Sequence, residues 1–523
     1  MIFASNAYQR TRAQDGFSLI IVLSVMLVTS LLLAAGLTAT DQDIHLSYSS
    51  QNHTQAYYAA LGGIQEYDYK LQNEPDFWQT CQGLSGESEG AHYEVKVLVA
   101  ESAPTGTTAC SPTSPFTTAI QSKGKFANTF QIESTACSGA NKLTSCQKQP
   151  AKVQLRSMVA TFGVTGFLDF AYFTQYEDED PMLSGNTAAE CEQYYSVRSK
   201  NGSRCQEIEF APEDDVRGPM HTDDAANVCG AVEFGRKGEE PPDTVEINGG
   251  VNSLCREGTP TYNTATGSYT KGKELRAPES DSSLKLYVES ANEFEGATHL
   301  VLNGAANTIE VTNKGTTKTI SWPANGLIYI EKQQRGGTCT YEFEQVNADF
   351  SNEVPEEEGC GTVYVKGTYG KSLTIAAERE LIINGNLVPS GVTPGEAPSG
   401  TETLGLIATH FVRIYHPIEE RSGRCENAAG SLEDPWIYAA ILSTSHSFVV
   451  DNYNCGKQSQ LDRLNIYGAI AQKFRGIVGT TGGTGYLKNY NYDERLATDE
   501  PPYFLAPLKA GWKVVRETAP AAG

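Results

Sequence analysis

The chain has 523 residues, enough for two or three domains, and its 40 basic and 63 acidic residues give a net charge of −23. This excess of acid argues against nonspecific binding to nucleic acid, which depends on Lys and Arg neutralising phosphates. The 49 Gly, 23 Pro and 26 Tyr, with only 5 Met, are typical of a turn-rich exterior protein. We therefore expect a fold that is α+β to mainly β.

The first predicted element is an apolar helix. Residues 17–40 carry no formal charge, and as a helix they would rise about 36 Å, against about 30 Å for the hydrocarbon core of a bilayer. Arg10 and Arg12 precede this segment and Asp41 follows it. Such flanks predict a transmembrane helix that leaves the amino terminus in the cytoplasm and exports the rest of the chain. The apolar pattern continues beyond Asp41, so we expect one helix over residues 17–72, with its second half docked on a globular head.

At these residues the chain resembles the type IV prepilins, in which a short leader ends in Gly, Phe usually follows, and a hydrophobic helix opens the mature protein. The resemblance implies a leader over residues 1–16, cleavage by a prepilin peptidase between Gly16 and Phe17, and a methylated amino terminus. Asp15 departs from the basic residue usual before the cleavage site. Ile21 stands at the fifth mature position, where major pilins carry a Glu that pairs with the amine of a neighbouring subunit. PilX-like minor pilins and tip pseudopilins commonly lack that Glu.

Residues 73–163 are expected to form a small antiparallel sheet. Apolar and polar residues alternate in three segments, at residues 93–97, 130–133 and 153–156, with the period of half-buried strands. One face of this sheet should pack on the second half of the helix. The resulting unit resembles the pilin head.

The remainder of the chain is expected to be a large β region. Residues 164–370 alternate short strands with turns and contain several cysteines. Three apolar segments, the first at Gly405, then recur at spacings of 34 and 29 residues, and each precedes a second short strand. Such repeats suggest a parallel β-solenoid over residues 371–505, with a β-sandwich as the alternative. Residues 506–523 are expected to form a C-terminal tail with a final short strand.

The 12 cysteines all follow the apolar segment, and none forms a C-x-x-C pair, which argues against a zinc or thioredoxin-type site. In an exported chain disulfides are the default. Connectivity cannot be deduced from sequence, and sequential neighbours are the expected pairs. These pairs are Cys81 with Cys110, Cys137 with Cys146, Cys191 with Cys205, Cys229 with Cys255, Cys339 with Cys360, and Cys425 with Cys455.

The candidate catalytic and metal motifs are weak. Residues 370–372 lack the earlier Gly that a phosphate loop requires, and no helix pattern follows the Gly/Thr-rich residues 479–485, as a dinucleotide site would need. His221 and the acids within residues 214–224 could ligate calcium or act as acid and base, but they lack the order of a calcium loop. Turns and solvated acids explain this cluster and the acidic residues 177–180. We therefore expect no enzyme activity, no cofactor and no metal.

These features together predict a non-enzymatic minor pilin or pseudopilin of a type IV pilus or a related secretion or DNA-uptake filament, supporting assembly or adhesion at the tip. Its expected partners are other pilin subunits through the N-terminal helix, prepilin peptidase, and the lipid bilayer before assembly. The expected location is the cytoplasmic membrane, with a single span and an exported head, and then the cell surface.

Two alternatives stay open. One is a plain single-pass anchor, because apolar segments of this length are common. The other is a membrane-anchored extracellular β-solenoid enzyme or polysaccharide-binding protein. In that case Tyr490, Tyr492 and Tyr503 could stack on sugar, although a core role fits them equally well.

Leader cleavage can be tested directly. The mature protein should begin at Phe17, and Gly16→Val should retain the leader, because the peptidase of the family cuts after a Gly. Mass measurement of the N-terminal peptide from cells that contain the peptidase distinguishes the two products. Ala13→Val, inside the leader, is the matched control and should be cleaved like the wild type. Recovery of wild-type protein that still begins at Met1 would contradict the prepilin interpretation.

Overall fold

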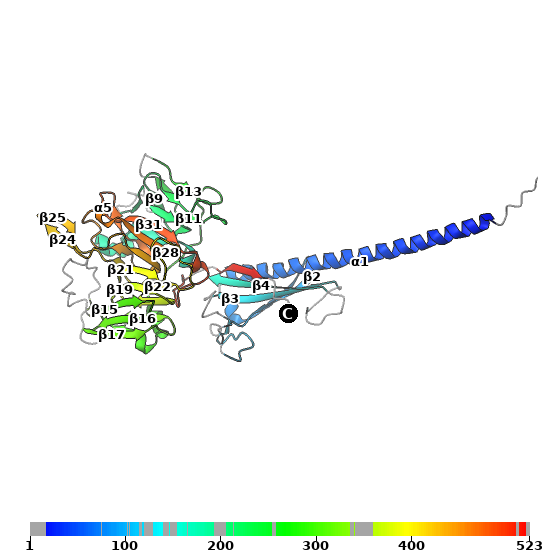
Figure 1. Ribbon diagram of the computed structural model, residues 1–523, viewed down its shortest axis with the longest axis horizontal. Helices are drawn as coiled ribbons and strands as arrows, with labels where there is room; N and C mark the ends of the chain where they lie inside the picture. Colours follow the sequence, from blue (N-terminus) through cyan, green and yellow to red (C-terminus); the bar gives the residue numbers. More distant parts are fainter. Residues whose placement is uncertain are drawn as a thin grey trace, which may run out of the picture.

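The computed structural model describes most of the chain (Figure 1). The described residues are 17–74, 76–101, 103, 105–114, 118–119, 129–139, 146, 154–164, 166–192, 205–212, 214–253, 258–334, 339, 359–508 and 512–518.

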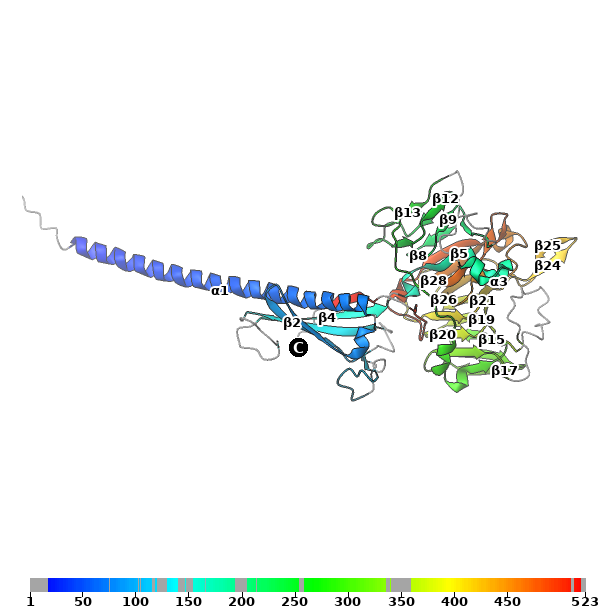
Figure 2. The same ribbon diagram turned by 180° about the vertical axis from the view of Figure 1, so that it is seen from behind.

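One long helix, α1 (Phe17–Asn73), opens the described chain. Its 57 residues rise about 86 Å, and its first half projects away from the rest of the protein (Figures 1 and 2). In the second half, Ala60, Ile64, Tyr67 and Leu71 recur every three or four residues and are fully buried. Gly63 lets this half lie close to the sheet, since a Cβ there would sit 2.5 Å from Ser134 Oγ.

The prediction of a transmembrane helix over residues 17–40 was wrong. Within the part of the chain that the structure describes, no helix is both long and apolar enough to cross a bilayer. The side chains of residues 35–45 lie outside the described part. The predicted fold class is therefore corrected to a mainly β protein with one long helix and a large, multi-sheet β head.

The helix packs on a five-stranded antiparallel sheet with the order β1-β2-β3-β4-β32. These strands are β1 (Leu84–Ser88), β2 (Ala91–Val97), β3 (Thr129–Ser138), β4 (Gln154–Val164) and β32 (Trp512–Thr518). The core between helix and sheet contains Phe130, Ile132 and Phe162 beside Tyr67. Because β32 comes from the end of the chain and pairs with β4, the whole β head is inserted between two neighbouring strands of this sheet. We call α1 and this sheet the helix–sheet module.

The β head is built from parallel ladders that stack side by side. One ladder runs through β14 (Glu293–Glu295), β18 (Leu327–Glu331), β20 (Leu373–Ala377), β22 (Leu404–Ala408), β26 (Trp436–Ser443) and β28 (Arg463–Arg475). A second runs through β15 (Thr298–Asn303), β19 (Val363–Tyr369), β21 (Leu381–Pro389), β23 (Val412–Ile414) and β27 (Phe448–Val450). The three repeated segments of the sequence are β22, β26 and β28, which are adjacent and parallel. An antiparallel three-stranded meander extends the end of the stack. It is formed by β15, β16 (Thr308–Asn313) and β17 (Thr316–Ser321).

The chain enters this stack in its middle. Its first head strand, β5 (Tyr172–Glu179), pairs with β28, and the ladder continues on the far side through β8 (Met220–Thr222) and β11 (Val245–Ile247). Beside it, β31 (Leu487–Tyr492) pairs with both β28 and β7 (Asp215–Arg217). The first and last coils of the head therefore meet, and we call this junction of β5 and β7 with β28 and β31 the seam.

Residues 271–292 connect one end of the stack with the other and cover an outer face of the strands. Leu275, Ala277 and Leu284 of this crossing segment are buried in a cluster with outward-facing residues of β18 to β28. Small side chains on those strands, such as Ala376 and Ala440, leave room for the covering segment. Asp281 fixes its position by accepting hydrogen bonds from Tyr329 and Thr409 at 3.1 and 3.0 Å.

Five disulfides join sequential cysteines, as expected from the sequence, and no described cysteine is free. The pairs are Cys81–Cys110, Cys137–Cys146, Cys191–Cys205, Cys339–Cys360 and Cys425–Cys455. Cys229 is also disulfide-bonded, and its expected partner, Cys255, lies outside the described residues. The last of the five pairs anchors the protruding hairpin of β24 (Ile418–Arg421) and β25 (Arg424–Asn427) (Figures 1 and 2).

Removing β32 should weaken the helix–sheet module and leave the head intact. A chain truncated after Leu508 loses the ladder between β32 and β4 and the packing of Val514. With each net hydrogen bond contributing about 1 kcal/mol, we expect the module to lose about 2–4 kcal/mol. Calorimetry should show one lowered and one unchanged unfolding transition. Truncation after Thr518 is the control and should change neither; identical thermograms for the two truncations would contradict the role of β32.

Candidate functional site

The exposed half of α1 is the first candidate surface. Twelve large apolar side chains along it are each between 50 and 68% exposed. They are Leu19, Ile20, Ile21, Val22, Leu23, Val25, Met26, Leu27, Val28, Leu31, Leu32 and Leu33. Apolar surface of this extent marks a site of interaction with another apolar partner. We call these residues the apolar helix surface.

The residues predicted from the prepilin resemblance fall at the start of this surface. Gly16 lies outside the described residues, and α1 begins at Phe17, whose side chain is also not described. Ile21, at the predicted fifth mature position, is 53% exposed. It presents an apolar side chain at the position where major pilins carry a carboxylate. The Ser and Thr hydroxyls along this half of α1 turn back onto the helix, as in Ser24 Oγ to Ile20 O at 2.7 Å. The surface therefore offers packing contacts.

The acidic residues 177–180 and 214–224 are not solvated acids, and that interpretation was wrong. Glu177, Asp178 and Asp180 are at most 1% exposed. Glu177 pairs with Arg475 of β28 at 2.7 Å, and Asp180 accepts from His446 and Ser447, both at 3.0 Å. These carboxylates therefore join the beginning of the head to its end.

His221 is buried between two carboxylates. Its Nδ1 lies 2.6 Å from Glu246 Oε2 and its Nε2 lies 2.8 Å from Asp223 Oδ1, while Phe173 stacks on the ring. Burial lowers the pKa of His221, but the hydrogen bonds to Asp223 and Glu246 outweigh it and raise the pKa overall. Asp223 is held in turn by the backbone N–H of Leu275 in the crossing segment. The ring is enclosed on both nitrogens, and among the described residues no cluster of His, Cys, Asp and Glu can hold a metal ion.

The other sequence candidates are structural. The Gly/Thr-rich residues 479–485 form the tight hairpin of β29 (Gly479–Thr480) and β30 (Thr484–Gly485). Tyr490 and Tyr492 are buried, so they support the core and cannot stack on a sugar from solvent. Tyr503 stacks on the exposed Tyr287 with ring centroids 5.4 Å apart.

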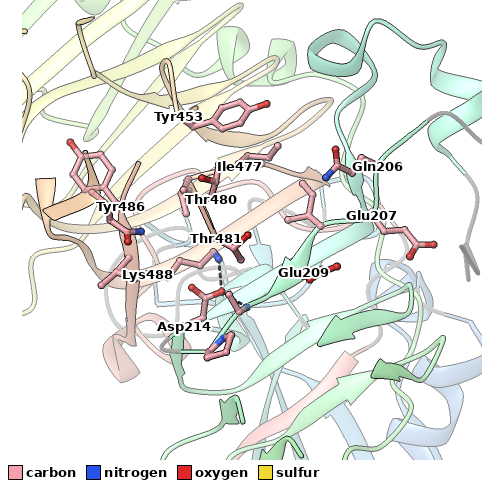
Figure 3. Close-up of a pocket in the computed structure, with 18 residues that line it drawn as sticks. Gln206, Glu207, Glu209, Asp214, Tyr453, Ile477, Thr480, Thr481, Tyr486 and Lys488 are labelled. Atoms are coloured by element: carbon pink, nitrogen blue, oxygen red, sulfur yellow. Dashed lines mark hydrogen bonds and ion pairs between the residues drawn. The ribbon is translucent and has the colours of Figure 1, made fainter. Parts of the chain in front are cut away.

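A pocket of about 600 Å³ opens at the seam (Figure 3). One wall consists of residues 206–209, 211, 212 and 214, which follow β5, and the other of residues 476–481 and 486–488, which follow β28. Tyr453 lies at the top of the view, and Lys488 and Asp214 meet at the base of the pocket. We call this cavity the seam pocket.

The seam pocket is acidic despite its lysine. Lys488 Nζ lies 2.5 Å from Asp214 Oδ2, so this ion pair is neutral as a unit. Burial lowers the pKa of Lys488 more than Asp214 raises it. Glu207 and Glu209 also line the cavity, and its walls therefore carry a net negative charge. Behind them, Arg475 donates to the backbone oxygens of Ile208 and Glu209 at 3.1 and 3.2 Å.

Sequence reasoning did not identify the seam residues. Arg475 and Lys488 each stand next to an apolar residue in a strand, and the structure buries Arg475 fully and Lys488 for the most part. A basic residue inside such a strand is a sequence signal for a buried pair, because a buried charge needs a partner. The identity of the partner is not available locally, since Glu177 is 298 residues away from Arg475.

No protein-family model matches the chain, and no curated protein matches it. Among solved structures, the chain is similar to the competence-associated pilin ComZ from Thermus thermophilus. That likeness covers 89% of this chain and 97% of the other, with 13% identity and a TM-score of 0.29. At this score we base no argument on the likeness, and the functional argument rests on the chain's own geometry.

The Lys488–Asp214 pair can be tested by a double-mutant cycle. Asp214→Asn keeps an acceptor for the backbone N–H of Ala211 but leaves the ammonium of Lys488 buried without its carboxylate. We expect a loss of about 3 kcal/mol in the free energy of unfolding. Adding Lys488→Met should recover part of this loss, because the stranded charge is removed. Glu233→Gln, at an exposed carboxylate, is the control and should be neutral. Equal stability of the Asn variant and the wild type in urea unfolding would show that the pair contributes nothing.

Proposed function

We propose that the protein is a non-enzymatic minor subunit of a type IV pilus-like filament, placed at its tip. The observation that carries the proposal is the division of α1. Its first half exposes the apolar helix surface, and its second half is docked on an antiparallel sheet. A helix with this division is suited to pack against the helices of other subunits while the sheet carries what the subunit displays. The disulfides support a location outside the cytoplasm.

The position of the head supports the tip. The head lies at the end of the helix–sheet module that is opposite the apolar helix surface (Figures 1 and 2). In a filament with helices packed along its axis, a subunit stacked above would have to occupy the space that this head fills. A terminal subunit has free space above it.

Ile21 supports the same placement. In the prepilin resemblance the fifth mature residue gives a carboxylate to the amine of a neighbour, and Ile21 has none to give. The proposed amine at Phe17 can still seek a carboxylate from a major subunit. Pairing would then be one-sided, as befits the end of a filament. The proposed processing between Gly16 and Phe17 by a prepilin peptidase belongs to this function.

Labelling of filaments tests the placement. An antibody against the head should mark filament ends at low copy number, and deletion of the gene should reduce the number of filaments. Ile21→Glu should raise the fraction of label along the shaft, because it restores a carboxylate for a neighbouring amine. Ile21→Gln, of similar size and uncharged, is the control and should stay at the ends. Uniform shaft labelling of the wild type, near the abundance of the major subunit, would rule out a tip role.

A further inference from the structure

Two carboxyl groups stand directly opposite each other in a short antiparallel pairing at the seam. Asp178 of β5 faces Glu207 across an isolated antiparallel bridge. The flanking hydrogen bonds run from Glu179 N to Gln206 O at 2.8 Å and from Ile208 N to Glu177 O at 3.2 Å. This pattern makes Asp178 and Glu207 a non-hydrogen-bonded pair, in which opposing side chains come closest. Like charges at such a position repel each other.

Both carboxyl groups are buried in an acidic neighbourhood. Asp178 is 1% exposed and Glu207 is 7% exposed. The charged groups close enough to act on Asp178 are Asp224 after β8, Glu207 on the opposite segment, and its neighbour Glu177 on the same strand. Asp178 Oδ2 has no hydrogen-bond partner in the described part of the protein. The nearby cation, Arg475, is engaged with Glu177 and with the backbone oxygens of residues 208 and 209.

This environment favours a proton on Asp178. Burial first, and then the charges of Asp224, Glu207 and Glu177, raise the pKa of Asp178 from 3.8 to about 8. A protonated carboxyl group carries an O–H donor, and a carboxylate beside it is an acceptor. One proton therefore converts a repulsive pair into one that can share a short, charge-assisted hydrogen bond.

The segment that carries Glu207 is a wall of the seam pocket. Residues 206–209 line the cavity, and the two backbone hydrogen bonds around the Asp178–Glu207 pair attach this wall to β5. The disulfide Cys191–Cys205 tethers the segment at its start, and β6 (Glu209–Phe210) holds it at its end by pairing with β9 (Ala226–Val228), so residues 206–208 can separate from β5 without leaving the head. Opening of the wall would expose Asp178 to water and widen the pocket.

We propose that Asp178 and Glu207 form a proton-dependent latch, in which one shared proton holds the wall of the seam pocket closed and its loss releases the wall. The closed form binds the proton more tightly than the open form, in which Asp178 regains an ordinary carboxyl affinity. The free energy that favours the closed form is therefore largest in acid and falls as the pH rises. It reaches its lowest value above the pKa of Asp178 in the closed form. The latch does not depend on the filament role proposed above.

Amide hydrogen exchange of the whole protein tests the latch. The quantity to measure is the protection factor of the Glu179 and Ile208 amides, in which the intrinsic pH dependence of exchange has been removed. Between about pH 5 and pH 7.5 it should fall about tenfold per pH unit, because each opening of the wall in this range releases one proton. Amides in β22 and β26, far from the pair, should keep constant protection factors and report that the head stays folded.

Three variants separate the latch from a general loss of stability. Asp178→Asn keeps a donor at the same place without a titrating proton, and its protection factors should be independent of pH. Glu207→Gln removes one like charge, so the dependence should level off at a lower pH. Glu233→Gln, at an exposed carboxylate, should behave like the wild type. The proposal is overturned if the wild type shows no pH dependence, or if Asp178→Asn shows the same dependence as the wild type.

Discussion

The head depends on charges that can be buried only when its first and last coils meet. Glu177 and Arg475 are separated by 298 residues, yet they form a 2.7 Å ion pair with both side chains almost inaccessible to water. Asp214 with Lys488 and Asp180 with His446 also join distant parts of the head, each through a buried Asp and a partly exposed partner. Breaking such a pair strands a buried charge at a cost of about 3–5 kcal/mol. A head with an open seam would strand several, so the ladders favour a single closed register.

The parts of the fold that follow from local pattern could be predicted. The helix from Phe17, the alternating strands of the small sheet and the repeated strands are each visible within a short window of sequence. The cysteine pairs were expected between sequential neighbours, although the sequence alone does not determine which cysteines pair. The predicted membrane span was wrong, since no helix in the described part of the chain is both long and apolar enough to cross a bilayer. The role of β32 and the seam pairs could not be predicted, because their partners lie hundreds of residues away. The acids at 177–180 look solvated in sequence since nothing nearby shows that Arg475 will reach them.

The helix–sheet module and the head differ in how much of their apolar surface is covered by the rest of the protein. In the module, one face of the second half of α1, including Gly63, packs on aromatic and apolar side chains of the sheet, and its first half exposes large apolar side chains. In the head, both faces of the strands are covered, the inner by apolar side chains and the outer by the crossing segment over small residues such as Ala376 and Ala440. The module therefore retains exposed apolar surface, whereas the strands of the head are largely covered.

Placing β32 at the end of the chain has a consequence for the timing of biogenesis. A ribosome makes α1 and strands β1 to β4 first, but the strand that pairs with the open side of β4 is made only after the entire head. The sheet behind the helix can therefore be completed only after the head has been synthesised. A prematurely terminated product would display a helix without its finished support and an unpaired strand edge, which is a target for degradation or aggregation. The order of synthesis thus couples completion of the sheet to completion of the head.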